Sequence, residues 1–161
     1  MEILKRLLNV FSGGKKKEPV KTFEDLEALK REFLETDFYL SSNVLSSAER
    51  NEANAKLHSL AIEIASFFGG PEMVEVLADT LRDIPKEKTR EPSEALKELL
   101  RSGDLLTLIK EFKANLFIML VALNGDVQEN LNIRLGYVAT EIASRMGGSE
   151  FFWKLSTVLQ E

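Results

Sequence analysis

Few side chains in this chain of 161 residues are of the types that carry out catalysis or bind metals. The chain has no cysteine and a single histidine, His58, which excludes disulfides, thiolate metal sites, cysteine nucleophiles and two-histidine metal sites. His58 has no second histidine or acidic partner at metal-ligand spacing, so we expect a structural or surface histidine rather than a ligand or general base. The stretch at 12–17, SGGKKK, lacks the spacing of a phosphate-binding loop, and neither a dinucleotide fingerprint nor a serine-hydrolase elbow occurs.

Two glutamates, Glu63 and Glu141, occupy matching positions in an internal repeat. Two carboxylates related in this way could form an acid/base pair or a metal site. Helical bundles that hold two metal ions, however, use Glu-x-x-His motifs, and the chain has none. We therefore expect both glutamates to face solvent or to pair along their helices, and we expect no metal and no cofactor.

The repeat joins residues 54–81 to residues 132–159 without gaps, at an offset of 78 residues. Twelve of the 28 pairs are identical, where unrelated segments would share about two from composition alone. Each copy contains a Gly-Gly pair followed by a short segment of helical pattern, and each is preceded by another long segment of helical pattern. The repeat predicts two copies of a three-helix unit, packed as one helical bundle or as a short α-solenoid.

Aromatic residues distinguish the two copies. Trp153 aligns with Glu75, and Phe67 aligns with Arg145. Since tryptophan often anchors protein interfaces, Trp153 is interpreted as a contact with a partner or a second subunit, with Phe152 and Phe67 as further candidates. The alternative is that these rings fold onto the end of the bundle.

From residue 22 onward the pattern is helical throughout. Apolar spacing, capping residues and glycine stops predict helices over residues 23–45, 48–68, 71–82, 93–101, 104–123, 126–146 and 149–160. Start signals are Thr22 with Asp25, Ser46 with Glu49, and Asp126 with Glu129, because a capping side chain satisfies free backbone N–H groups at a helix start.

The eight residues 116–123, LFIMLVAL, are all apolar. Such a run spans about 12 Å as a helix, against about 30 Å for the hydrocarbon core of a bilayer. It therefore does not predict a transmembrane span. A helix that is apolar all round is buried, so we expect a central helix of the core, or else a helix covered by a second subunit.

The first 21 residues differ from the rest in charge. They hold six lysine or arginine residues against two glutamates, a net charge of +4, which leaves −9 for the remainder of a chain whose net charge is −5. Residues 3–11 predict a short amphipathic helix, which the Gly- and Lys-rich residues 12–21 join to the body as a flexible linker. Its apolar face consists of Ile3, Leu4, Leu7, Leu8 and Phe11, with Lys5 and Arg6 opposite. The pattern does not match a secretory signal.

These observations predict a non-enzymatic, all-α interaction module: an adaptor, scaffold or regulatory subunit that binds a protein partner and forms homodimers. Residues 1–21 are the head. Residues 22–161 are one domain made of repeats at about 22–82 and 100–160, joined by a charged loop at 83–92.

The head has three interpretations: it docks on its own body, enters a groove of a partner, or binds an anionic membrane weakly through residues 1–17. The last makes a peripheral membrane protein at the inner face the alternative to a cytoplasmic adaptor. A carboxylate-based enzyme or metal site is the third alternative. The acidic charge argues against nucleic acid as a partner.

Overall fold

A computed structural model describes residues 22–83, 91–122 and 124–161. Over these residues the chain forms seven helices and no strand, which confirms the predicted all-α class. The helices are α2 (Phe23–Ser42), α3 (Ser47–Phe68), α4 (Pro71–Arg82), α5 (Glu94–Ser102), α6 (Leu105–Val121), α7 (Gly125–Arg145) and α8 (Ser149–Gln160). The predictions for the head and for most of the loop at 83–92 fall outside the described residues.

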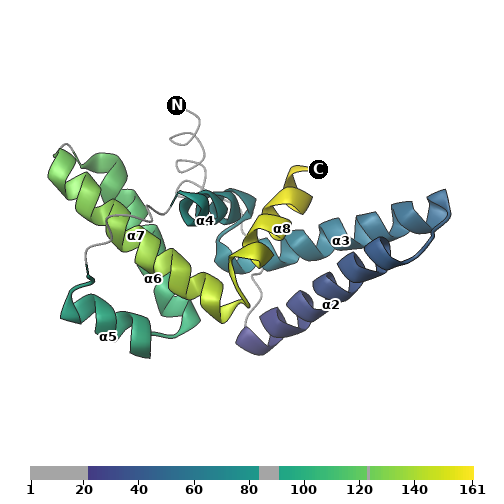
Figure 1. The fold of residues 1–161 in the computed structure, drawn as a ribbon, viewed down its shortest axis with the longest axis horizontal. Helices are drawn as coiled ribbons and strands as arrows, with labels where there is room; N and C mark the ends of the chain where they lie inside the picture. The colour runs from purple at the N-terminus through teal and green to yellow at the C-terminus, as the bar shows by residue number, and fades with distance from the viewer. Residues whose placement is uncertain (1–21, 84–90, 123) are drawn as a thin grey trace.

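Two long helical hairpins flank a central pair of short helices. Helices α2 and α3 form one hairpin, α6 and α7 form the other, and α4 lies against α8 between them (Figure 1). Each short helix also packs on the second long helix of both hairpins, so α4 contacts α3 and α7, and α8 contacts α7 and α3. The packing is therefore reciprocal: each short helix contacts its own hairpin and the other hairpin.

Two Gly-Gly corners turn the chain from each hairpin into its short helix. Gly69 and Gly147 have φ angles of +108° and +93°, a region that side chains with a Cβ rarely enter. The second glycine of each pair donates its N–H to the carbonyl of the residue five positions earlier, at 2.9 Å in the first corner and 2.8 Å in the second. These bonds satisfy carbonyls that the helix end leaves free, and the same geometry closes both corners.

Capping side chains start most of the helices where the sequence predicts. Thr22 accepts a hydrogen bond from the Asp25 N–H at 3.0 Å, and Ser46 forms a reciprocal capping box with Glu49. The predicted cap of α7, Asp126, is wrong: the helix begins at Gly125, and the side chain of Asn124 accepts from the Asp126 and Val127 N–H groups. An asparagine can cap without an acid three residues later.

The core is built from the inward faces of both hairpins and both short helices. Residues that lie 78 positions apart in the sequence are buried in both halves of the core: Leu57 and Leu135, Ala61 and Ala139, Ile64 and Ile142, Ala65 and Ala143, Leu77 and Leu155. A row of edge-to-face aromatic rings joins α2, α8 and α3, with centroid distances of 5.9 Å for Phe33–Phe151, 5.6 Å for Phe151–Phe152 and 5.1 Å for Phe152–Phe68.

The prediction that residues 116–123 form a buried central helix is wrong for much of the run. Leu116 is buried, but Phe117, Ile118 and Val121 are 51%, 46% and 61% exposed, and α6 ends at Val121. The reason is that α6 packs chiefly on α7 among the described helices. One stripe of α6 suffices for that contact: Leu105, Leu108, Ile109, Phe112 and Leu116.

Candidate interaction surfaces

The outward side of α6 presents a row of apolar residues. We define the α6 outer face as Leu106, Ala114, Phe117, Ile118 and Val121 with the neighbouring Val127 of α7, all of which are exposed. Helical spacing aligns the α6 members on one side of the helix. Val127 lies at the same end of the hairpin, because its neighbour Gln128 donates to the Ala122 carbonyl at 2.8 Å. An exposed apolar row of this kind is typical of a binding surface.

A polar network between α6 and α7 fixes which side of α6 faces outward. The Glu111 carboxylate accepts from Arg134 Nε at 3.0 Å and from Arg134 Nη2 at 2.7 Å. The same oxygen accepts from Nδ2 of the buried Asn115 at 3.2 Å. Rotating α6 would break the two bonds from Arg134 of α7 and leave these partly buried polar groups unsatisfied, so the apolar row is held at the surface.

Two acidic residues follow the C-terminal end of this face in the sequence. Asp126 and Glu129 are exposed in the first turns of α7, beside the end of α6. The last turn of α6 contains no lysine or arginine, so no side-chain cation in that turn offsets the negative end of the helix dipole. The electrostatics here favour an apolar ligand that carries positive charge.

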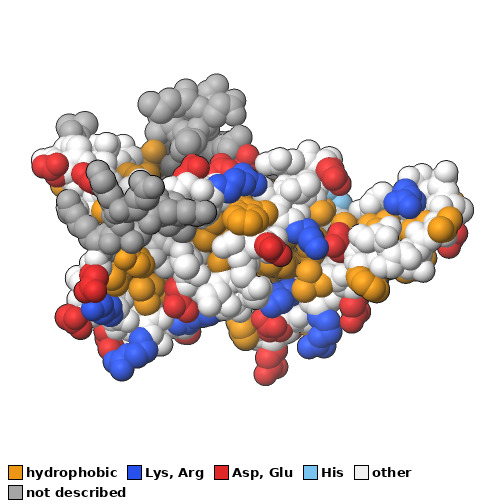
Figure 2. Space-filling view, in the orientation of Figure 1, with side chains coloured by type: hydrophobic (Ala, Val, Ile, Leu, Met, Phe, Trp, Pro, Cys, Tyr) orange, Lys and Arg blue, Asp and Glu red, His pale blue; other side chains and the backbone are white. Residues whose placement is uncertain are grey.

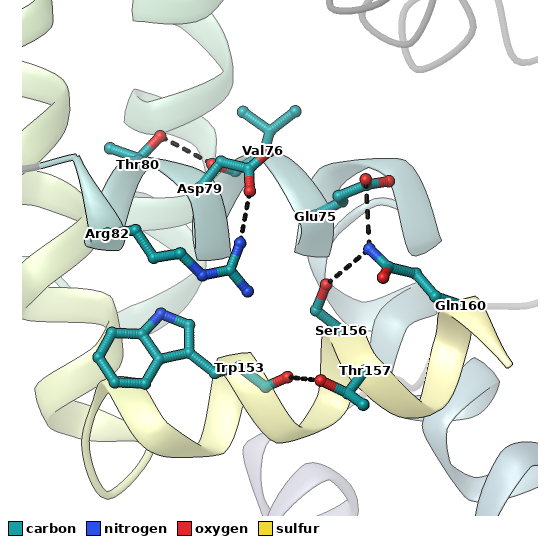
Figure 3. A network of polar contacts seen from close by, with 9 residues as sticks. All are labelled: Glu75, Val76, Asp79, Thr80, Arg82, Trp153, Ser156, Thr157 and Gln160. Atoms are coloured by element: carbon teal, nitrogen blue, oxygen red, sulfur yellow. Dashed lines mark hydrogen bonds and ion pairs between the residues drawn. The ribbon is translucent and has the colours of Figure 1, made fainter.

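Trp153 lies on α8 and projects toward α4. Figure 3 shows its ring and the Arg82 side chain pointing into the same gap between the two helices. Trp153 is half-buried. Its indole Nε1 is buried and has no hydrogen-bond partner among the described residues, while Arg82 pairs with Asp79 at 2.8 Å.

The surroundings of Trp153 have a counterpart at positions 78 residues away in the sequence. The offset of 78 residues relates Glu75 to Trp153 and Arg82 to Gln160. Gln160 Nε2 donates to Glu75 at 3.3 Å (Figure 3). The pair Glu75–Gln160 thus corresponds to the pair Trp153–Arg82, and one polar contact of the central helices is replaced by an aromatic ring beside a cation.

The other two predicted partner residues are placed differently. Phe152 is fully buried between Phe68 and Phe151, which assigns it to the core and leaves it no surface for a partner. Phe67 is partly buried against the core, with its ring 5.5 Å from that of Phe68. Its counterpart Arg145 instead donates to the Leu100 carbonyl at 2.9 Å and to the Gly103 carbonyl, so it holds the end of α5 against α7.

The free end of the α2/α3 hairpin carries a separate groove of about 470 Å³. Four of its lining residues are the glutamates Glu32, Glu35, Glu49 and Glu52, and Tyr39 and Lys56 contribute to its walls. Lys56 lies 3.8 Å from Glu32. Figure 2 shows hydrophobic side chains interspersed with charged ones on this hairpin. Phe38, on α2, is 70% exposed.

The residues considered for catalysis or metal binding are separated from any cluster. His58 is half-buried and Glu63 is exposed, while Glu141 accepts from Arg145 Nε at 3.1 Å. Within the described ranges, no group of three or more histidine and acidic side chains is placed to hold a metal ion.

Two carboxylates with a lowered pKa are helix caps or cap partners. The pKa of Glu49 is lowered by hydrogen bonds with the side chain and backbone of Ser46, and the pKa of Asp104 is lowered by those with Thr107.

Ile3, Leu4, Leu7, Leu8, Phe11, Lys5 and Arg6, predicted to anchor the head, lie outside the described residues. No helix in the part of the chain that the structure describes is long and apolar enough to cross a bilayer. Comparison with protein-family models, with curated proteins and with solved structures found no match.

Sequence reasoning missed the α6 outer face, although a signal for it was present. The apolar run at 116–123 contains more hydrophobic residues than one inward stripe of a helix requires. An excess of that kind indicates either burial on all sides or an apolar surface, and periodicity alone does not distinguish the two.

Proposed function

We propose that this chain is a non-enzymatic helical interaction module that binds an amphipathic helix of a protein partner on the α6 outer face. The observation that carries the proposal is the exposure of Ile118 and Val121 on a helix whose inward stripe is already complete. An apolar helix laid along this row would bury its side chains in the manner of helix-in-groove recognition. The composition supports a role in binding, because the chain has no cysteine and one histidine.

The acidic surroundings determine the chemistry of the partner. Asp126 and Glu129 favour a helix with lysine or arginine on the flank of its apolar stripe, and opposite charges at an interface raise the association rate. Such binding weakens at high ionic strength, since exposed charges are screened beyond about 8–10 Å.

Binding of cationic amphipathic helical peptides, labelled with a fluorophore, tests the proposal. We expect anisotropy to report binding to the full chain and to Val44→Glu, but not to Val121→Glu. Val44 is a matched control because it is a fully exposed valine outside α6. Equal binding to both variants, or no binding by any peptide of the panel, would contradict the proposal. Fluorescence of the single tryptophan, Trp153, checks that each variant is folded.

We also propose that the two hairpins with their short helices are tandem copies of one three-helix unit, arranged about a local two-fold axis. The identical hydrogen bonds at the two Gly-Gly corners and the reciprocal packing of α4 and α8 support this. Reciprocal packing favours a closed bundle over an open solenoid, in which each repeat contacts only its neighbours.

Self-association is the second form of this proposal, because the α6 outer face is also available to another copy. The face consists of six residues, against about 20–30 residues on each side of an interface of standard size. A homodimer through this face alone would therefore be weak. Light scattering of the full chain over a concentration series measures it, with Val121→Glu expected to abolish any dimer.

A further inference from the structure

The α6 outer face and the N-terminal head have complementary chemistry. The face offers an apolar row with acidic residues, Asp126 and Glu129, at one end. Residues 3–11 offer an apolar stripe with Lys5 and Arg6 on the other side, within a segment of net charge +4. An isolated helix of nine residues is marginal in water, so this segment needs an apolar surface to be helical.

We propose that residues 3–11 of the same chain bind as a helix along the α6 outer face. The inference rests on the proposed function, because both assign a helix to the α6 outer face. Internal docking makes the head a competitor of the partner helix. A short helix suits the face better than a second copy does, since the exposed row is small for a stable dimer.

The linker is long enough for this placement. The first half of α2 lies beside the end of α7, because Lys30 Nζ is 3.4 Å from the position of a Cβ on Gly147, and Figure 1 shows the start of α2 near this corner. Helix α7 has 21 residues, so its other end, with Val127, is about 30 Å away. The ten residues 12–21 span up to about 33–36 Å when extended. The head therefore reaches the face from its own chain.

Electrostatics favour docking of the head at the C-terminal end of α6. The head, with its net charge of +4, would be attracted to Asp126 and Glu129 and to the C-terminal end of α6, whose last turn contains no cation. Cations near a helix C-terminus interact favourably with its dipole. Lys110, between Leu106 and Ala114, is nearer the N-terminal end of α6 than its C-terminal end.

The absence of cysteine from the chain allows a clean crosslinking test in the full-length protein. One variant combines Val10→Cys with Ala114→Cys on the outer face. The control combines Val10→Cys with Ala48→Cys, another exposed alanine on a helix, at the free end of the α2/α3 hairpin. Helix α2 has 20 residues, so this end is about 30 Å from the start of α2, which is comparable to the distance of the end of the face that carries Val127. A short bismaleimide joins cysteines that come close.

We expect intramolecular crosslinking with Ala114→Cys to exceed that with Ala48→Cys by about tenfold or more, as for a tethered ligand that binds its site. Adding Leu4→Glu and Leu8→Glu should reduce it to the control level. Equal crosslinking of the two pairs would overturn the inference. So would crosslinked dimers without crosslinked monomers, which would place the head on a second copy. Flotation of the uncrosslinked chain with anionic vesicles, without a crosslink in their absence, would assign the head to membranes and overturn it too.

The peptide experiment separates this inference from the proposed function. If the head occupies the face, Leu4→Glu with Leu8→Glu should strengthen peptide binding by about tenfold or more, because the competing internal helix is removed. Peptide binding that depends on Val121 but is unchanged by the head variant would overturn the internal docking and leave the proposed function intact. Efficient crosslinking in a chain that binds no peptide would support the internal docking and contradict the proposed function.

Discussion

Replacing Gly148 by alanine tests the backbone geometry that joins each hairpin to its short helix. Gly148 has φ +119° and ψ 168°, a region that is almost restricted to glycine and costs a residue with a Cβ about 1–3 kcal/mol. A Cβ built on Gly148 meets no atom within 4 Å, so steric overlap adds nothing. Alanine also restricts the unfolded chain, which returns about 0.4–1 kcal/mol. We expect a net loss of about 1–2 kcal/mol in the free energy of unfolding.

Urea denaturation followed by far-UV circular dichroism and by Trp153 fluorescence measures this loss. Since Trp153 is the only tryptophan and lies on α8, its emission reports on the element that follows the altered corner. The midpoint of thermal unfolding should fall by roughly 2–8 °C, at about 2–4 °C per kcal/mol for a chain of this size.

Two matched substitutions make the result decisive. Gly125→Ala, at the first residue of α7, places a Cβ in open space without a positive φ, and it should leave stability unchanged or raise it by up to about 1 kcal/mol. Gly70→Ala, at the equivalent position of the first corner, should match Gly148→Ala to within about 0.5 kcal/mol. If Gly148→Ala behaved like Gly125→Ala, the reasoning from backbone strain would be refuted. Unequal effects at the two corners would count against their equivalence.

Four further predictions concern the core, the polar network, the caps and the central aromatic ring. Phe152→Ala should lower the free energy of unfolding by about 3–5 kcal/mol, because it removes a fully buried ring; a loss below 1 kcal/mol in urea denaturation would contradict its place in the core. Glu111→Ala should cost about 1–3 kcal/mol in the same assay, since it strands its polar partners, and a neutral result would show that the network does not hold α6 in place. The lowered pKa values of Glu49 and Asp104 predict stability that is present at neutral pH and is lost as the pH falls below about 4. Combining Glu49→Gln with Asp104→Asn should flatten the acid limb of a thermal-unfolding series, and an unchanged limb would contradict the assignment. Trp153→Glu should keep the fold, measured by circular dichroism, because a carboxylate there would face a cation. It should also leave peptide binding unchanged, because Trp153 lies on α8 and outside the α6 outer face, and a loss of peptide binding would place Trp153 in the interface.

Local signals in the sequence predicted the helices because local physics determines their ends. The caps at Thr22 and Ser46 and the two Gly-Gly corners lie where expected, since each depends on a few neighbouring residues. The start of α7 was misplaced because Asn124 caps without the acidic partner that marks a capping box.

The burial of individual side chains was harder to predict, because the same apolar pattern occurs on buried helices and on exposed helix faces. The apolar run at 116–123 carried no information on which of its sides would meet α7, and Ile118 and Val121 proved to be exposed. Trp153 differs in type from its counterpart Glu75 and is half-buried, and its contact with a partner stays a prediction. The same comparison favours the core for Phe152, since its counterpart Val74 is apolar and both are fully buried, so the interpretation of Phe152 as a partner contact went against that signal.

The reciprocal packing of α4 and α8 has a consequence for how the molecule folds. Because α4 completes the environment of α7 and α8 completes that of α3, neither hairpin can bury its apolar side until both halves of the chain are present. Unfolding should therefore be all-or-none, without a species in which one half persists alone. Folding should be slower than in a bundle of sequential neighbours, because contacts across nearly 80 positions must form first. During synthesis the first half would wait, with its apolar side exposed, until the last helix leaves the ribosome.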